Sequence, residues 1–346
     1  MLPHFHLLGL HIPMYSLMVA VGAFAFLIYF KIFVEKKEKL DRITANRMIF
    51  VSVLGFLVLG LSALIFNSIF HSIEKGTIVV GGITWLGGVI GVIPATICLI
   101  HYLVPKERGN AVNRFSSLLP GLVIAHAFGR LGCFFGGCCY GARTDSWLGV
   151  SFPAGSLAGK QYPDFNAPES SIIVNETLNE AGETVVTKLY PSLPVLPTQL
   201  IEAVFEILLF VVMIVFYKKL KNYNIEIYCF VYGTFRFILE FWRGDSRGAT
   251  GIAISPSQFM SIILFIGATL LILYRNGIIC KKTAKKCEIW REEAKTKEPT
   301  PIRAVFTANT AAKTADSIRE LHNLYKEGLL TEEEFKKKKE ELLARF

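Results

Sequence analysis

Two arginines lie near the ends of separate apolar segments, where they could bind a phosphate group. Arg130 is part of a glycine-rich stretch, residues 129–141, that also contains three cysteines and a tyrosine. Arg236 is followed four residues later by Glu240, so both would share one face of a helix. A charged side chain at membrane depth is costly and by default marks a functional site. Because the guanidinium group binds two oxygens while staying charged, the two arginines indicate recognition of a lipid phosphate.

The composition is that of a membrane protein. Of the 346 residues, 52% are hydrophobic and 19% are charged, whereas soluble domains have roughly 25% charged residues. Apolar runs of about 20 residues, the length that crosses a bilayer, occur seven times. They cover residues 13–34, 48–72, 84–104, 115–136, 197–217, 225–242 and 256–275. We therefore expect an all-α polytopic membrane protein with seven transmembrane helices.

Lysine and arginine are concentrated in alternate loops. They gather after the first, third and fifth segments, whereas the loop after the second contains only Lys75. Because positively charged loops remain in the cytoplasm, we expect the N-terminus outside and the C-terminus inside. Orientation and contact with anionic lipid then account for the net charge of +9, and no nucleic acid partner is expected.

This orientation brings polar or aromatic residues from several segments to the outer leaflet. They are Tyr15 in the first segment, Trp85 in the third, Arg130 in the fourth, Gln199 and Glu202 in the fifth, and Arg236 in the sixth. The shared depth follows from the topology alone and favours one common site.

Structural roles are the alternative for each residue. A single interfacial arginine can be a snorkelling anchor, and Trp85 can belong to the interfacial aromatic belt. Arg236 and Glu240 can form a buried structural ion pair. Arg243 and Asp245 are interpreted as exposed loop charges. The joint occurrence of these residues favours the functional interpretation.

Cys133, Cys138 and Cys139 are expected near the outer surface. Packing of small residues is the first interpretation, and a disulfide or reactive thiol, which oxidising conditions permit, is the second. A metal site is the third, because adjacent cysteines do not readily share one tetrahedral ion without a loop built for it. The nearest further ligand, His126, is interpreted as a polar packing residue. We therefore expect neither metal nor cofactor.

The loop 137–196 is too long to be a simple connector. Two β-prone runs, 171–175 and 184–189, flank a turn at 180–183 and predict a β-hairpin. We expect this loop to form a small extracytoplasmic domain that caps the site.

The C-terminal region is expected to be cytoplasmic. Residues 277–314 are interpreted as a basic juxtamembrane segment and a linker, and residues 316–327 and 332–344 as a helical hairpin within 315–346. Two short helices bury little surface, which favours a protein partner or self-association. This tail resembles the short C-terminal domain (SHOCT) appended to many bacterial proteins.

Several linked motifs in residues 1–276 resemble those of the prolipoprotein diacylglyceryl transferase family. These motifs are residues 81–88, 129–134, 144–153, 197–202 and 232–243. The resemblance implies transfer of diacylglyceryl from phosphatidylglycerol to the lipobox cysteine of preprolipoproteins, in the bacterial cell (inner) membrane. It implies that Arg130, Arg236, Tyr15 and Glu240 are catalytic, the arginines binding the headgroup and the leaving phosphate. The residues implied in substrate binding are Arg243, Gln199, Glu202, Trp85, Gly129, Gly132, His126, Cys133 and Cys138.

The chain departs from the family pattern at several polar positions. Cys133 replaces an asparagine and Cys138 a glutamate, while Leu86, Ser116 and Leu196 also replace family residues that carry polar groups or an aromatic ring. Loss of an acid or base slows a reaction by about 10²–10⁴-fold. Slow transfer or a changed acceptor is therefore one expectation. A non-catalytic phospholipid-binding protein, with a tail for a partner or oligomerisation, is the alternative, and no inverted repeat favours a transporter.

Overall fold

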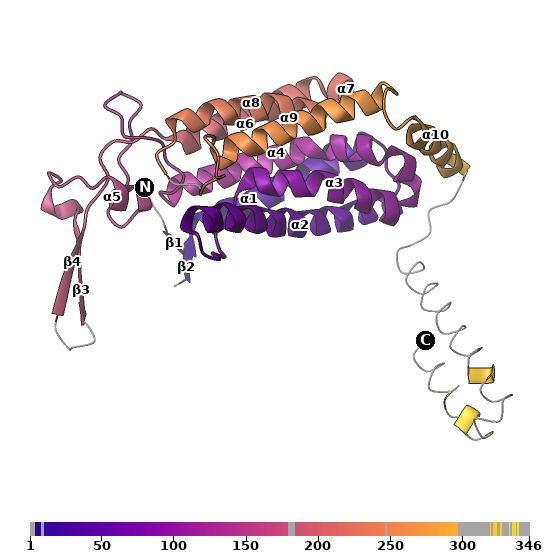
Figure 1. Cartoon of the computed structure of the whole chain (residues 1–346), viewed down its shortest axis with the longest axis horizontal. Coiled ribbons are helices and arrows are strands. Elements are labelled where there is room, and N and C mark those ends of the chain that lie inside the picture. Colours follow the sequence, from indigo (N-terminus) through magenta and orange to yellow (C-terminus); the bar gives the residue numbers. More distant parts are fainter. Residues whose placement is uncertain are drawn as a thin grey trace.

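The long helices of the protein lie side by side in one elongated bundle (Figure 1). The computed structural model describes residues 4–7, 10–178, 184–245 and 248–296, with scattered positions between 319 and 338. The helices of the bundle are α1 (Met14–Tyr29), α2 (Arg42–Lys75), α3 (Trp85–Leu103), α4 (Ala111–Phe135), α6 (Thr198–Val215), α8 (Asn224–Leu239) and α9 (Pro256–Arg275).

Six helices in the described part are long and apolar enough to cross a membrane. They cover Met14–Lys36, Arg42–Lys75, Trp85–Leu103, Pro105–Phe135, Thr198–Val215 and Pro256–Arg275. The segment expected at 225–242 corresponds to α8, which has only 16 residues before a 3₁₀ turn, Glu240–Trp242. The polytopic helical architecture is thus confirmed, while the seventh crossing and the orientation stay predictions.

The ends of these helices are determined by local sequence. The Asp41 carboxylate accepts a hydrogen bond from the Thr44 backbone N–H (3.0 Å) at the start of α2, and Gly76 (φ 65°) ends that helix. Ser255 and Gln258 form a capping box at the start of α9. Such caps satisfy the unpaired N–H groups of a helix terminus.

One face of α2 is apolar and exposed. Its residues recur every four positions: Val53, Leu57, Leu61, Ile65, Ile69 and Ile73. A stripe with this spacing lies on one side of a helix, and such an exposed apolar surface is suited to lipid tails. The opposite side of α2 packs against α3.

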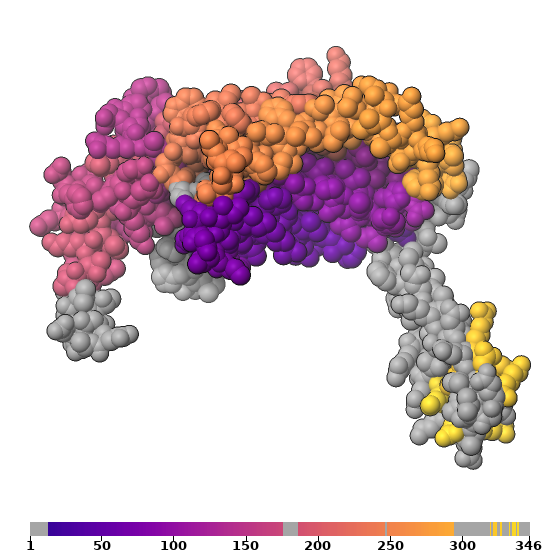
Figure 2. All heavy atoms as spheres, in the orientation of Figure 1, coloured from indigo at the N-terminus to yellow at the C-terminus, as the bar shows by residue number. Residues whose placement is uncertain are grey.

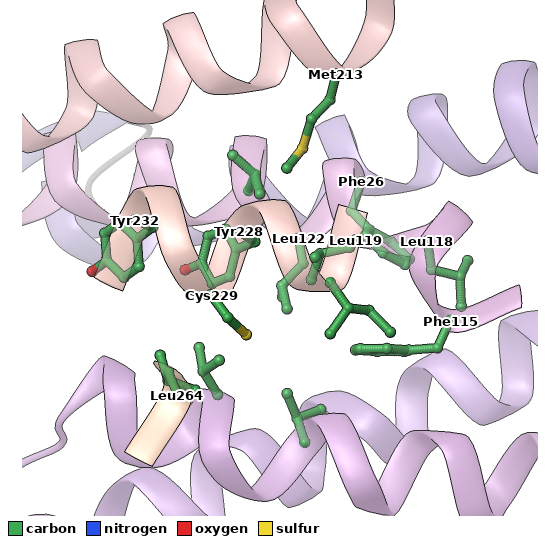
Figure 3. Close-up of a cluster of buried hydrophobic side chains, with 14 of the residues drawn as sticks. Phe26, Phe115, Leu118, Leu119, Leu122, Met213, Tyr228, Cys229, Tyr232 and Leu264 are labelled. Atoms are coloured by element: carbon green, nitrogen blue, oxygen red, sulfur yellow. The ribbon is translucent and has the colours of Figure 1, made fainter. Parts of the chain in front are cut away.

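The apolar core lies between the helices, and Figure 3 shows its centre. Phe115, Leu118, Leu119 and Leu122 of α4 face Phe26 of α1 and side chains from the later helices. The later helices contribute Met213, Tyr228, Cys229, Tyr232 and Leu264. The core therefore joins the first four helices to the last three.

Three loops rich in lysine and arginine meet at the end of the bundle where α10 (Lys281–Thr296) lies (Figure 1). The Glu38 carboxylate accepts hydrogen bonds from Arg114 (2.8 Å), Lys221 (2.8 Å) and Tyr217 (2.9 Å). Burial alone would raise the pKa of Glu38, but these hydrogen bonds and cationic charges outweigh it and hold the pKa below its ordinary value. The network fastens this end of α1 to α4 and α7 (Tyr217–Leu220).

The segment between α4 and α6 forms a separate lobe at the other end of the bundle (Figure 2). Tyr140, Phe152, Ala158 and Val195 make its small core. The expected hairpin is confirmed, because β3 (Ile173–Leu178) pairs antiparallel with β4 (Thr184–Leu189). The first strand is shifted toward the C-terminus relative to the expected 171–175, and the expected turn at 180–183 lies outside the described residues.

Two elements were not expected from the sequence. Strands β1 (His4–Leu7) and β2 (Leu10–Pro13) pair antiparallel before α1. Helix α10 lies within the expected linker 277–314, where Arg291 donates to the Gly109 carbonyl (2.8 Å) and the Trp290 ring contacts His101 (4.7 Å between ring centroids). These contacts hold α10 against the bundle.

Most of the expected SHOCT-like hairpin lies outside the described residues. Among the positions that are described, Leu321 is buried and the His322 and Phe335 rings are 5.8 Å apart. Positions from both expected helices therefore meet, while assignment to the SHOCT domain stays a prediction.

Candidate functional site

Arg130 is buried on α4 and has two partners. Its Nη2 lies 2.9 Å from Oε1 of Glu202, and its Nε donates to His126 Nε2 (3.1 Å). Since Nε2 accepts this bond, Nδ1 carries the imidazole proton and donates to Oε1 of Glu206 (2.9 Å). Both glutamates on α6 are fully buried. The interpretation of His126 as a satisfied polar residue agrees with this geometry.

Aromatic rings enclose this group. The Trp85 indole stacks on the His126 imidazole, with 3.8 Å between centroids and 5° between planes. Trp85 Nε1 donates to the Tyr228 hydroxyl (2.8 Å), and the Tyr232 hydroxyl donates to Oε1 of Glu202 (2.7 Å). Trp85 therefore contacts the polar cluster itself, which favours its placement in the site over a role in the aromatic belt.

Arg236 lies one helical turn beyond Tyr232 on α8 and is also buried. Its Nη1 is 2.6 Å from Oε2 of Glu240, and its Nη2 donates to the Ser257 hydroxyl of α9 (3.0 Å). The expected pair of Arg236 and Glu240 is thus present. Through Tyr232 and the shared Glu202 oxygen, the surroundings of the two arginines are continuous.

Arg243 and Asp245 are not exposed loop charges, and that expectation was wrong. The Arg243 side chain is 3% exposed and its Nη2 lies 2.6 Å from Asp245 Oδ1. Its Nη1 donates to the Cys139 carbonyl (2.6 Å), which also accepts from the Thr198 hydroxyl (2.9 Å). The loop after α4 and the turn after α8 approach each other here, so Arg243 is enclosed between them.

Gln199 holds the same loop, because its Nε2 donates to the Cys138 carbonyl (2.7 Å). The thiol sulfurs of Cys133, Cys138 and Cys139 all lie within 4.8 Å of one another. The sequence did not predict this approach, since it depends on two residues with left-handed backbone, Gly137 and Cys139 (φ 64° each).

Glycine at position 132 allows α1 to approach α4. A Cβ there would lie 3.2 Å from Cδ2 and from the backbone oxygen of Tyr15. Tyr15 thus lies beside Gly132 with its residue 36% exposed. A Cβ at Gly129 would meet nothing within 4 Å in the described part, so packing does not explain that glycine.

The other three residues that differ from the family pattern take no part in the hydrogen bonds around Arg130. Leu86 is buried in the core at the start of α3. The Ser116 carbonyl accepts from Asn224 Nδ2 (3.1 Å), and the Leu196 carbonyl accepts from the Gly141 N–H (2.8 Å). None of the three supplies an acid or a base.

Sequence reasoning missed Glu206, Tyr228, Tyr232, Thr198 and Ser257. A signal existed for two of them: Glu206 follows Glu202 by four residues and Tyr232 precedes Arg236 by four, which places each on the face of a predicted site residue. The same spacing rule that joined Arg236 to Glu240 would have found both.

The sequence profile of the family described as "Prolipoprotein diacylglyceryl transferase" matches residues 3–274. The chain belongs to this family. The resemblance seen in the sequence motifs is thereby confirmed, and the transferase family also accounts for the multi-pass architecture.

Three relatives show how far the similarity extends. "Phosphatidylglycerol--prolipoprotein diacylglyceryl transferase 2" of Clostridium perfringens is 32% identical over 59% of this chain, and the match spans 64% of that protein. The transferase of Clostridium tetani is 25% identical over 76% of this chain and 92% of its own length. That of Campylobacter hominis is 26% identical over 76% of this chain and 86% of its own length.

Proposed function

We propose that the protein transfers diacylglyceryl from phosphatidylglycerol to the lipobox cysteine of preprolipoproteins, at the outer leaflet of the bacterial inner membrane. The family membership and the names of the relatives support this activity. The observation that carries it in this chain is the buried cluster around Arg130 and Arg236, in which each arginine is held by its own glutamate.

In the reaction, the thiol sulfur forms a bond to the terminal glycerol carbon of the diacylglyceryl group. The bond from that carbon to the phosphate oxygen breaks, and glycerol phosphate leaves with the electron pair and the thiol proton. Negative charge develops on the departing phosphate. Preorganised cations in a dry site stabilise such charge strongly, and Arg130 and Arg236 supply them.

The glutamates orient the arginines and leave donors for the lipid. Arg130 uses Nη2 and Nε for Glu202 and His126, and Arg236 uses Nη1 and Nη2 for Glu240 and Ser257. Each guanidinium group has five N–H bonds, so three remain on each arginine, including those on Nη1 of Arg130 and Nε of Arg236, and these are assigned to the phosphate. A rigid arrangement of this kind avoids reorganisation during the reaction.

Buried acceptors are available for the two hydroxyl groups of the phosphatidylglycerol headgroup. In the described part of the chain, Gln199 Oε1, Glu202 Oε2 and Glu206 Oε2 are buried without a hydrogen-bond partner. Buried polar atoms are nearly always satisfied, and the two hydroxyls of the headgroup offer one donor each. We assign two of these three acceptors to the headgroup glycerol.

A transfer assay tests the proposal. The purified full chain is incubated with acyl-labelled phosphatidylglycerol and a lipobox peptide, and labelled thioether peptide is measured. We expect Arg130→Ala and Arg236→Ala to lower the rate by at least about 10²-fold. Arg143→Ala is the matched control, since that side chain is 56% exposed in the outer lobe.

The second candidate is a phospholipid-binding protein without transfer activity, whose tail recruits a partner or self-associates. It is favoured by the cysteines at positions 133 and 138, because a thiol supplies neither the amide of the asparagine nor the carboxylate of the glutamate that the family pattern has there. Phosphatidylglycerol binding without labelled product would support it and contradict the transferase proposal.

A further inference from the structure

The three sulfurs beside the arginine cluster have the spacing of a metal site. Cys133 lies in the last turn of α4, and Cys138 and Cys139 lie in the loop that follows. Their Sγ atoms are within 4.8 Å of one another. Zinc binds thiolates at about 2.3 Å, which in a tetrahedron separates the sulfurs by about 3.8 Å. Binding of zinc would therefore draw the sulfurs together by up to about 1 Å.

The backbone makes it feasible for adjacent cysteines to act together. Consecutive side chains of an extended chain point in opposite directions, but Cys139 has a left-handed backbone (φ 64°) that removes this alternation. The Cys138 N–H also donates to the Cys133 carbonyl (3.1 Å), which turns the loop back toward α4. A non-glycine residue in this conformation is strained, and such strain gathers at functional sites.

Neighbouring side chains hold the loop in place. Gln199 Nε2 donates to the Cys138 carbonyl, and Thr198 Oγ1 and Arg243 Nη1 donate to the Cys139 carbonyl. Supporting contacts of this kind fix the ligands of metal sites in position. The sulfur atoms themselves are not used by these three donors.

The charges are also suitable. Three thiolates around one Zn²⁺ leave a single negative charge. Arg130 precedes Cys133 by three residues on the same helical face, and Arg243 contacts the Cys139 carbonyl. Two cations thus lie next to the loop that would carry this charge.

We propose that Cys133, Cys138 and Cys139 bind one zinc ion whose fourth position takes the acceptor thiol. Zinc sites with three protein ligands and one open position are catalytic rather than structural. This inference rests on the proposed transferase function, because it names how the acceptor is bound and activated. It also removes the need for the carboxylate that position 138 does not provide.

The reaction remains balanced with zinc present. A thiol bound to zinc gives up its proton, and that proton leaves on the phosphate oxygen of glycerol phosphate. The sulfur attacks the terminal glycerol carbon, a C–S bond forms, and the C–O bond breaks with its electrons going to the phosphate. The zinc is neither oxidised nor reduced.

Metal analysis of the full chain in detergent provides the first test. After incubation with Zn²⁺ under reducing conditions and removal of unbound metal, we expect about one zinc per chain. Cys133→Ser, Cys138→Ser and Cys139→Ser should each lower zinc retention at least about tenfold, because each removes one thiolate. Cys98→Ser is the control, since Cys98 is exposed on α3. The thermal unfolding midpoint in detergent monitors the fold of every variant.

Cobalt substitution provides the second test. Bound Co²⁺ should give thiolate-to-metal charge-transfer absorption, which strengthens when a lipobox peptide adds a fourth sulfur. The peptide with serine in place of cysteine should leave the absorption unchanged. Removal of zinc from the wild type should slow transfer at least tenfold, and Arg130→Ala should abolish transfer while zinc is retained.

Several results would overturn the proposal. The wild-type protein could retain no zinc, retain copper in its place, or retain no more zinc than the triple serine variant. A disulfide among the three cysteines in protein purified under reducing conditions would also contradict it, as would undiminished transfer by zinc-free protein. If the peptide strengthens the cobalt absorption but no transfer occurs, the zinc site stands and the transferase function fails.

Discussion

Arg130 and Tyr232 come from different helices and meet on one oxygen, Oε1 of Glu202, at 2.9 Å and 2.7 Å. The oxygen lies in a side chain with no solvent exposure. Removing one member of a buried ion pair leaves an uncompensated charge, which costs about 3–5 kcal/mol. Glu202 is therefore central to both the stability and the proposed chemistry.

We predict that Glu202→Gln abolishes measurable transfer and lowers the thermal midpoint in detergent. The amide keeps the shape of the side chain but removes the negative charge that orients Arg130. Glu169→Gln, at an exposed position of the outer lobe, should change neither quantity. Normal transfer by Glu202→Gln would show that Arg130 does not depend on this carboxylate.

The stacked pair of Trp85 and His126 allows ring packing and hydrogen bonding to be separated. Trp85→Phe keeps an aromatic face but loses the bond to Tyr228, which costs about 1 kcal/mol. His126→Phe leaves Arg130 Nε and Glu206 without their partner and should cost at least about 2–3 kcal/mol. Unfolding of both variants in mixed micelles shows which of them loses more stability. Equal losses would contradict the assigned hydrogen bonds.

The Glu38 network predicts a pH-dependent contribution to stability. The folded-state pKa of Glu38 is below its ordinary value of 4.5, so the stabilisation is fully present above about pH 4.5 and is lost as the pH falls through the folded pKa. The difference in thermal midpoint between wild type and Glu38→Gln should be largest near neutral pH and should shrink in acid. A difference that grows on acidification would have the wrong sign.

Two glycines provide a matched test of helix contact. A Cβ at Gly22 of α1 would lie 2.8 Å from the Ala125 carbonyl oxygen, whereas a Cβ at Gly60 of α2 would meet nothing within 4 Å. We predict that Gly22→Ala destabilises the protein by about 1–3 kcal/mol. Gly60→Ala should be neutral or stabilising by up to about 1 kcal/mol, because alanine favours helix. Unfolding midpoints of the two variants, measured side by side, test whether only Gly22 is needed for helix contact.

Sequence patterns predicted the helices well because apolar runs and caps are local. Hydrophobic length located six helices that are long and apolar enough to cross a membrane, and helical spacing joined Arg236 to Glu240. The short α8 was predicted as a full span because Phe241 and Trp242 continue the apolar pattern beyond Glu240, although the backbone turns there to a 3₁₀ form.

The rest of the site depends on contacts between distant segments. The sequence predicts Arg243 to be an exposed charge. It is enclosed only because the Cys139 loop, 104 residues away, approaches it. Similarly, the sulfur cluster depends on two left-handed residues, Gly137 and Cys139, and residue types alone do not reveal the conformation of Cys139. Glu206 acquires its role through His126, from another helix.

The close approach of α1 and α4 has a consequence for how the site can adapt. Near Gly22 the two helices meet through main-chain atoms, so their separation there is set by covalent geometry that hardly varies. Helices α6 and α8 instead face α4 through side chains such as Glu202 and Tyr232, whose sizes set the separation. The spacing of α1 and α4 is thus fixed by the main chain, whereas the spacing of α4, α6 and α8 changes whenever one of these side chains is replaced.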